Sequence, residues 1–193
     1  MSVFVFILNS ILFGIGLAMD AFSVSMANGL AEPDMHITRS AKIAGIFGLF
    51  QTVMPLIGWF FVRTAARTFK AFQLAIPWIA LFLLLYIGGK MLYEGFSKKG
   101  GAVISIAVDT KTLLIQAVAT SIDALSVGFT IADFDLSQAF VESLIIGVVT
   151  FLICLAGIKI GKVLGLKLEG KADILGGVIL IAIGIRIFIA GVF

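Results

Sequence analysis

Two aspartates stand inside long apolar stretches of this sequence, in strings that almost repeat. Asp20 lies in Met-Asp-Ala-Phe-Ser-Val (19–24), and Asp123 lies in Ile-Asp-Ala-Leu-Ser-Val (122–127). A carboxylate at the depth of a lipid bilayer is unfavourable by roughly 2.5–3.5 kcal/mol on insertion scales, so such residues usually have a function. Two acids at matching places in two half-chains indicate a cation site built by internal duplication.

The side chains on the same helical faces, and at matching positions of two further apolar stretches, are hydroxyls and one amide. They are Ser23, Gln51, Thr120, Ser126 and Thr150. With Asp20 and Asp123 they form a set of hard oxygen ligands, which suits Mg2+, Ca2+ or Mn2+ rather than copper. Two carboxylates would balance one divalent cation. The serine hydroxyls have an alternative role, because they could bond only to their own backbone.

A structural role for the aspartates is also open. Lys90 and Arg186 lie within apolar stretches as well, and they could form buried ion pairs that only hold the helices together. The two roles are compatible, because these bases could pair with the aspartates when no metal is bound. Glu94, one turn after Lys90, could neutralise that lysine.

The composition places these residues in a membrane protein. Of 193 residues, 61% are hydrophobic and only 13% are charged, whereas a soluble domain has about 25% charged residues. The single cysteine, Cys154, excludes a disulfide framework and a cysteine metal cluster. The first apolar stretch lacks a basic start and is too long for a cleaved signal peptide, so we expect it to stay in the membrane.

The apolar stretches predict an all-α integral membrane protein with six transmembrane helices. A helix needs about 20 residues to cross the hydrocarbon core. The stretches that qualify are 4–30, 39–62, 74–96, 112–132, 138–160 and 173–193. Polar connectors separate them, including a turn expected at 63–70.

Matching residues run through both halves of the chain in the same order. The pairs are Asp20 with Asp123, Gly48 with Gly147, Gly58 with Gly157, and 88–90 with 184–186. We therefore expect a first three-helix repeat over 1–96, a linker over 97–111 and a second repeat over 112–193. Because three is an odd number of spans, the second repeat would cross the membrane in the opposite direction to the first. Transporters with such inverted repeats bind their substrate near the midplane of the membrane, between the repeats.

The basic residues predict an orientation. With the N-terminus outside, the inside connectors hold nine Lys and Arg residues and the outside connectors hold three. This excess favours both termini outside the membrane, although the basic connector after the second span argues against it. The orientation in the membrane explains the excess of Lys and Arg over Asp and Glu, so nucleic acid is not an expected partner.

Five strings of the sequence are specific when taken together. They are Met-Asp-Ala-Phe-Ser (19–23), Pro-Leu-Ile-Gly-Trp (55–59), Gly-Gly-Lys-Met with Glu-Gly-Phe (88–96), Ala-Thr-Ser-Ile-Asp-Ala (119–124) and Lys-Ala-Asp-Ile-Leu-Gly-Gly (171–177). In order and over nearly the whole chain, they resemble the MntP-type manganese efflux pumps of bacteria. The resemblance implies a six-span inner-membrane exporter that lowers cytoplasmic Mn2+, with Asp20 and Asp123 essential. Some members carry Glu where this chain has Gln51, which leaves ligation by Gln51 open.

These observations predict a secondary transporter, not an enzyme. The chain has no Gly-rich phosphate loop for ATP. The hypothesis is alternating access of two inverted repeats around Mn2+, which is a transported substrate rather than a tightly bound cofactor. Protons are the expected counter-ion, because carboxylates that release a metal can bind protons.

Other functions were weighed against this one. Export of Cd2+, Ca2+ or an amino acid would suit a similar bundle, and oxygen ligands alone do not rank divalent cations. An intramembrane aspartyl protease would also use two aspartates. Its Gly-x-Gly-Asp string is missing, because Leu17 follows Gly14-Ile15-Gly16. A scaffold without transport would predict that both aspartates can be changed without effect.

Overall fold

The computed structural model describes residues 3–97, 108–167 and 172–192. These residues form helices joined by short connectors, which confirms the all-α prediction. The helices are α1 (Val3–Ala31), α2 (Ile37–Ser97), α3 (Thr110–Thr130), α4 (Leu136–Lys167) and α5 (Ala172–Val192). Most of the predicted linker over 97–111 lies outside the described residues, as do the side chains of Lys90 and Glu94.

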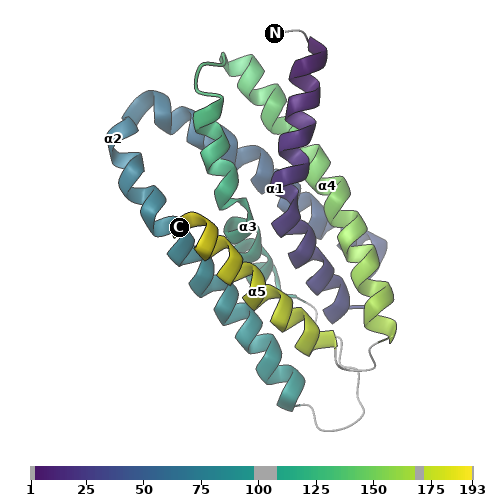
Figure 1. The fold of residues 1–193 in the computed structure, drawn as a ribbon. Coiled ribbons are helices and arrows are strands. Elements are labelled where there is room, and N and C mark those ends of the chain that lie inside the picture. Colours follow the sequence, from purple (N-terminus) through teal and green to yellow (C-terminus); the bar gives the residue numbers. More distant parts are fainter. Residues whose placement is uncertain (1–2, 98–107, 168–171, 193) are drawn as a thin grey trace.

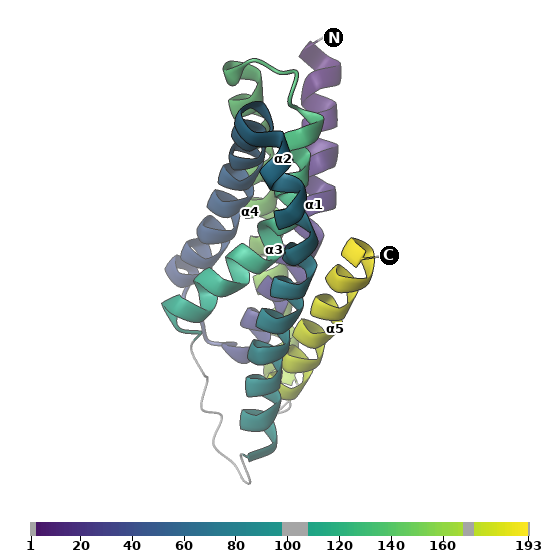
Figure 2. The same cartoon turned by 90° about the vertical axis from the view of Figure 1, so that its left-hand side faces the viewer.

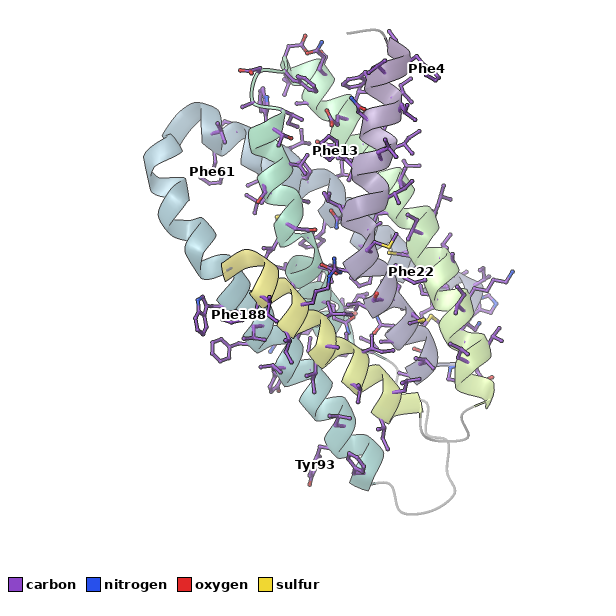
Figure 3. The ribbon with its side chains drawn as sticks, in the orientation of Figure 1. Phe4, Phe13, Phe22, Phe61, Tyr93 and Phe188 are labelled. Carbon is purple, nitrogen blue, oxygen red and sulfur yellow. The ribbon has the colours of Figure 1, made fainter. Side chains whose placement is uncertain are left out.

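The second and third predicted spans belong to one helix, α2, of 61 residues. The backbone over 63–70, where a turn was expected, is helical. Figure 1 shows that the α2 ribbon bends back on itself, and Phe61 lies at this bend in Figure 3. The segment 63–73 contains no Gly or Pro and is rich in Ala, Arg, Lys and Gln, so it favours a helix. Spans 39–62 and 74–96 thus become two arms of α2.

Three helical stretches of the described chain are long and apolar enough to cross a membrane. They are Val3–Ala31, Ile37–Val62 and Leu136–Gly165, and Ile174–Arg186 is a shorter apolar stretch. Helix α3 has a membrane-spanning length of 21 residues. Its hydropathy is lowered by polar residues, namely Gln116, Thr120, Ser121 and Asp123.

The helices pack as a bundle in which α1 lies along α4, while the arms of α2 contact α3 and α5. Figure 2 shows α5 beside the second arm of α2 and ending partway along the bundle. Helices α1 and α4 run in parallel, because Gly14 lies against Ile146 and Gly29 lies against Ile158. The core between the helices includes the fully buried Phe47.

Glycines bring pairs of helices to backbone contact. A Cβ atom at Gly58 would lie 2.2 Å from the carbonyl oxygen of Leu125 on α3. One at Gly157 would lie 2.7 Å from the carbonyl oxygen of Phe22 on α1. Leu125 and Phe22 each stand two residues after one of the aspartates. Small residues allow this close approach of membrane helices, so these glycines set how each aspartate helix is held.

The first arm of α2 crosses α4 at a further pair of matching glycines. A Cβ atom at Gly48 would lie 2.8 Å from the carbonyl oxygen of Gly147, and one at Gly147 would lie 2.7 Å from the carbonyl oxygen of Gly48. Each glycine therefore leaves room for the backbone of the other. The next turn of the two helices carries Gln51 and Thr150.

The two ends of the bundle are tied by different contacts. Arg39 forms an ion pair with Glu32 at 2.8 Å and donates to the carbonyl oxygen of Val108, also at 2.8 Å. At the opposite end the Trp59 indole donates to the carbonyl oxygen of Phe134 at 3.1 Å. The bonds to Val108 and Phe134 join α2 to connectors that flank α3, while the Arg39–Glu32 ion pair ties α2 to the connector that precedes it.

Candidate metal site

The two aspartates lie close to each other, with the guanidinium of Arg186 beside them. Asp20 on α1 is 7% exposed. It forms an ion pair with Arg186 on α5 and accepts a hydrogen bond from the guanidinium. Asp123 on α3 is exposed, although surrounding protein partly desolvates it, and its carboxylate lies within electrostatic range of Asp20 and Arg186. The fold therefore brings both predicted acids and one of the two predicted bases together.

Gln51 connects the two helices that carry the aspartates. Its side chain is fully buried on α2, and Nε2 donates to the carbonyl oxygens of Leu17 on α1 and Thr120 on α3, both at 3.2 Å. Leu17 and Thr120 each stand three residues before an aspartate. The Oε1 atom of Gln51 is buried and has no hydrogen-bond partner among the described residues. The amide nitrogen thus joins the two helices that carry the acids, and ligation of a cation by the amide oxygen stays a prediction.

Replacing Gln51 with Met is expected to loosen this connection. Met has a similar volume but no donor, so both bonds to the carbonyl oxygens are lost. We expect a loss of about 1–3 kcal/mol in the free energy of unfolding, together with weaker Mn2+ binding. Thermal unfolding in detergent and Mn2+ titration measure the two effects. Gln138→Met is the control at an exposed position of α4, where the side chain accepts only one bond, from the N–H of Asp135 at 3.3 Å. Mn2+ binding by Gln51→Met equal to that of Gln138→Met would contradict the role given to Gln51.

At the turn of α3 that carries Asp123, two backbone groups form hydrogen bonds with side chains. The carbonyl oxygen of Thr120 accepts from Gln51, and the N–H of Ala124 donates to Oδ1 of Asp123 at 2.9 Å. In an α-helix that carbonyl and that N–H are normally each other's partners. Both groups therefore have a side-chain partner at this turn of α3.

The predicted hydroxyl ligands are placed unequally around the acids. Thr120 is buried and donates to the carbonyl oxygen of Gln116 at 2.9 Å, and Ser23 donates to that of Met19 at 3.0 Å. Ser126 is exposed on the same face of α3 as Asp123. A hydroxyl that donates its proton to a carbonyl keeps its oxygen lone pairs, so ligation by these residues stays a prediction.

Thr150 on α4 is fully buried, and its hydroxyl has no hydrogen-bond partner among the described residues. It stands three residues after Gly147, as Gln51 stands three residues after Gly48. Because these two glycines are in contact, Thr150 lies within one turn of the crossing between α2 and α4. No contact joins it to an aspartate in the described chain.

Sequence reasoning missed a buried pair of amides. Asn28 on α1 and Gln116 on α3 are both fully buried, and each donates to the other, at 2.8 and 3.1 Å. This pair is a second connection between the helices that carry the aspartates. The sequence does hold a signal for this pair, because each of the two apolar stretches with an aspartate also contains an amide side chain.

The described residues contain no group of three or more His, Cys, Asp and Glu side chains that could hold a metal ion. A cation between Asp20 and Asp123 would therefore complete its coordination with neutral oxygens, as Mn2+, Mg2+ and Ca2+ do. The Oε1 atom of Gln51 is a neutral oxygen without a hydrogen-bond partner in the described chain, so it stays a predicted ligand. The available chemistry fits a hard divalent cation.

Comparison with known proteins gives one consistent family. A family model described as "Mntp: Putative manganese efflux pump" matches residues 34–188. A protein of Clostridium botulinum strain Hall named "Putative manganese efflux pump MntP 2" is 42% identical over 194 residues, which cover 95% of this chain and 94% of that protein.

Two further relatives carry the name "Putative manganese efflux pump MntP". The one from Clostridium perfringens strain SM101 is 40% identical over 95% of this chain and 94% of its own length. The one from Ruminiclostridium cellulolyticum is 39% identical over 95% of both chains. No solved structure matches this chain.

Proposed function

The chain belongs to the MntP family of manganese efflux pumps, and from this premise we propose that it exports Mn2+ through a site formed by Asp20 and Asp123. The family consists of transporters, so the protein is a membrane transporter rather than an enzyme. The observation that supports the proposed site is the ion pair of Asp20 on α1 with Arg186, which has Asp123 on α3 within electrostatic range. The buried amide of Gln51 joins the two helices that carry these acids.

The charge of the site suits a divalent cation. Two ionised carboxylates balance the two charges of Mn2+, and a buried ion with matched charge avoids most of the penalty for desolvation. The amide oxygen of Gln51 and the hydroxyls of Thr120, Thr150, Ser23 and Ser126 add neutral donors or orient the acids. Cd2+ and Ca2+ remain alternative substrates, because oxygen ligands select by cavity size and geometry.

Alternating access of two inverted repeats is the proposed mechanism. It is supported by matching contacts in the two halves: Gly58 lies against the carbonyl two residues after Asp123, and Gly157 lies against the carbonyl two residues after Asp20. The mutual contact of Gly48 and Gly147 would then lie at the symmetry axis. In such transporters one repeat rocks against the other around a fixed central site.

The proposal also includes six spans and a location in the cytoplasmic membrane, with both termini outside. Three described stretches already suit a membrane crossing, one of them the first arm of α2, and the second arm of α2, α3 and α5 would supply the others. Protons are the proposed counter-ion, carried by the carboxylates after the metal leaves.

Growth of bacteria on toxic metals tests the substrate. We expect that this chain, expressed in a bacterial strain without a manganese exporter, restores growth in high Mn2+ and lowers the Mn content of the cells. Growth in Cd2+ should not change. Protection against Cd2+ alone would replace Mn2+ as the substrate, and protection against neither metal would contradict metal export.

Replacing Thr150 with Val tests whether Thr150 serves Mn2+ binding or only the packing of the helices. The two side chains have nearly the same shape, and the hydroxyl of Thr150 is buried without a partner in the described chain. Removing an unsatisfied buried hydroxyl should leave thermal stability unchanged or raise it. If Thr150 serves the site, the KM for Mn2+ in proteoliposomes should rise several-fold in the same variant. An unchanged KM would assign Thr150 to packing alone.

A further inference from the structure

We propose that Arg186 is a tethered cation that competes with Mn2+ for Asp20, so that the guanidinium must leave the carboxylate before the metal binds and returns as the metal departs. This inference rests on the proposed function. Its basis is the direct contact between Arg186 on α5 and Asp20 on α1, beside Asp123.

The charges of these three side chains disfavour binding of Mn2+ while the Arg186 guanidinium is still at Asp20. Asp20, Asp123 and Arg186 carry two negative charges and one positive charge when ionised. Arginine side chains carry a fixed positive charge in proteins. Adding Mn2+ with Arg186 in place would leave one net positive charge, whereas Mn2+ with Arg186 withdrawn leaves none. An uncompensated charge at bilayer depth is costly, so the metal and the guanidinium should alternate.

The two partners of the ion pair differ in how much of each side chain the protein covers. The side chain of Asp20 is 10% exposed, while that of Arg186 is 65% exposed. The acid is thus held by its surroundings, and the long side chain of Arg186 has room to swing. A charged side chain with this exposure is tolerated at bilayer depth where it lines water rather than lipid. Asp123 and Ser126 are exposed as well, so further polar side chains lie on the open surface of α3 near the site.

The backbone that carries Arg186 is anchored. Gly177 on α5 and Gly88 on α2 contact each other through their backbones, because a Cβ atom at either would lie 2.7 Å from the carbonyl oxygen of the other. Gly184 also packs against Leu84, with its Cβ position 3.0 Å from the Leu84 Cβ atom. Release of Asp20 therefore needs only a rotation of the Arg186 side chain, not a displacement of α5.

Arg39 provides a contrast within the same chain. Its guanidinium is held by the Glu32 carboxylate and by the carbonyl oxygen of Val108, each at 2.8 Å, and its side chain is 35% exposed. It lies at one end of the bundle, away from the aspartates. Mn2+ in the proposed site should leave Arg39 unaffected, which makes it an internal control.

Labelling of the unmodified protein tests the inference without a mutation. The purified protein is treated with phenylglyoxal, which modifies accessible guanidinium groups, and the labelling rates of Arg186 and Arg39 are measured by mass spectrometry. We expect Mn2+ to raise the labelling rate of Arg186 several-fold and to leave that of Arg39 unchanged. An Arg186 rate that is unchanged or lowered by Mn2+ would overturn the proposal.

Substitution of Arg186 gives a second test. Arg186→Gln removes the competing charge, so Mn2+ should bind with a Kd on the order of tenfold lower. Transport in proteoliposomes should show a lower KM together with a lower kcat, because release loses the returning guanidinium; Arg186→Lys should lie closer to the original protein. A merely structural ion pair predicts the opposite, namely weaker Mn2+ binding in Arg186→Gln.

The failure of this inference can be told apart from failure of the proposed site. If Asp20→Asn abolishes Mn2+ binding while Arg186→Gln leaves Kd unchanged or raises it, only the competition is wrong. If Asp20→Asn and Asp123→Asn both bind Mn2+ as the original protein does, the proposed site is wrong, and the competition falls with it.

Discussion

Replacing Asp20 or Asp123 with Asn is expected to lower Mn2+ transport on the order of 100-fold in either case. Asn keeps the size of the side chain but removes the charge that balances the metal. The remaining carboxylate cannot neutralise a divalent cation, and in Asp20→Asn the guanidinium of Arg186 also loses its partner. Because the two acids act on one ion, the double variant should be little worse than either single variant.

Uptake of 54Mn2+ into inside-out vesicles measures this loss. Asp34→Asn is the matched control, because Asp34 is an exposed acid in the connector between α1 and α2. It should transport at nearly the original rate. If both single variants at Asp20 and Asp123 fold normally and transport as Asp34→Asn does, the two-aspartate site is refuted.

Replacing Gly58 or Gly157 with Ala is expected to prevent normal assembly of the bundle. The added Cβ atom would lie 2.2 Å from the carbonyl oxygen of Leu125 in the first case and 2.7 Å from that of Phe22 in the second. Backbone cannot yield as a flexible side chain can, so the helices must move apart. Overpacking costs about 1–3 kcal/mol where side chains adjust, and we expect at least this much at Gly157 and more at Gly58.

The yield of monodisperse protein and its thermal unfolding midpoint measure this effect. Gly45→Ala and Gly89→Ala are matched controls on α2, because nothing lies within 4 Å of the Cβ position at either glycine. Ala favours the helix by about 0.5–1 kcal/mol over Gly, so the controls should be as stable as the original protein or slightly more stable. Equal stability of all four variants would contradict the close packing at Gly58 and Gly157.

The sequence predicted the features that depend on repeated spacing. Asp20 and Asp123 were expected to meet because closely similar strings surround them in the two halves of the chain, and the structure brings them within electrostatic range of each other. The glycines at 48 and 147 were matched by spacing alone, and they prove to be in contact. Periodic and duplicated patterns carry information about packing because helices bury the same face at every turn.

Other features depend on contacts between distant segments, which spacing does not encode. The two bonds from Gln51 to backbone carbonyls require the first arm of α2 to pass between α1 and α3. The sequence left open which base would join the acids, and only the packing of α5 brings Arg186 to Asp20. The helical bend of α2 over 63–70 was missed because charged residues were taken as a turn, although Ala, Arg and Lys are good helix formers.

Equilibrium binding of Mn2+ to the purified protein tests the central claim most directly. The proposed site predicts one Mn2+ per chain in the original protein and in Asp34→Asn. It predicts affinity lower on the order of 100-fold in Asp20→Asn and in Asp123→Asn alike, since each carboxylate supplies half of the balancing charge. Stoichiometric binding with undiminished affinity in both single variants would show that the metal binds elsewhere.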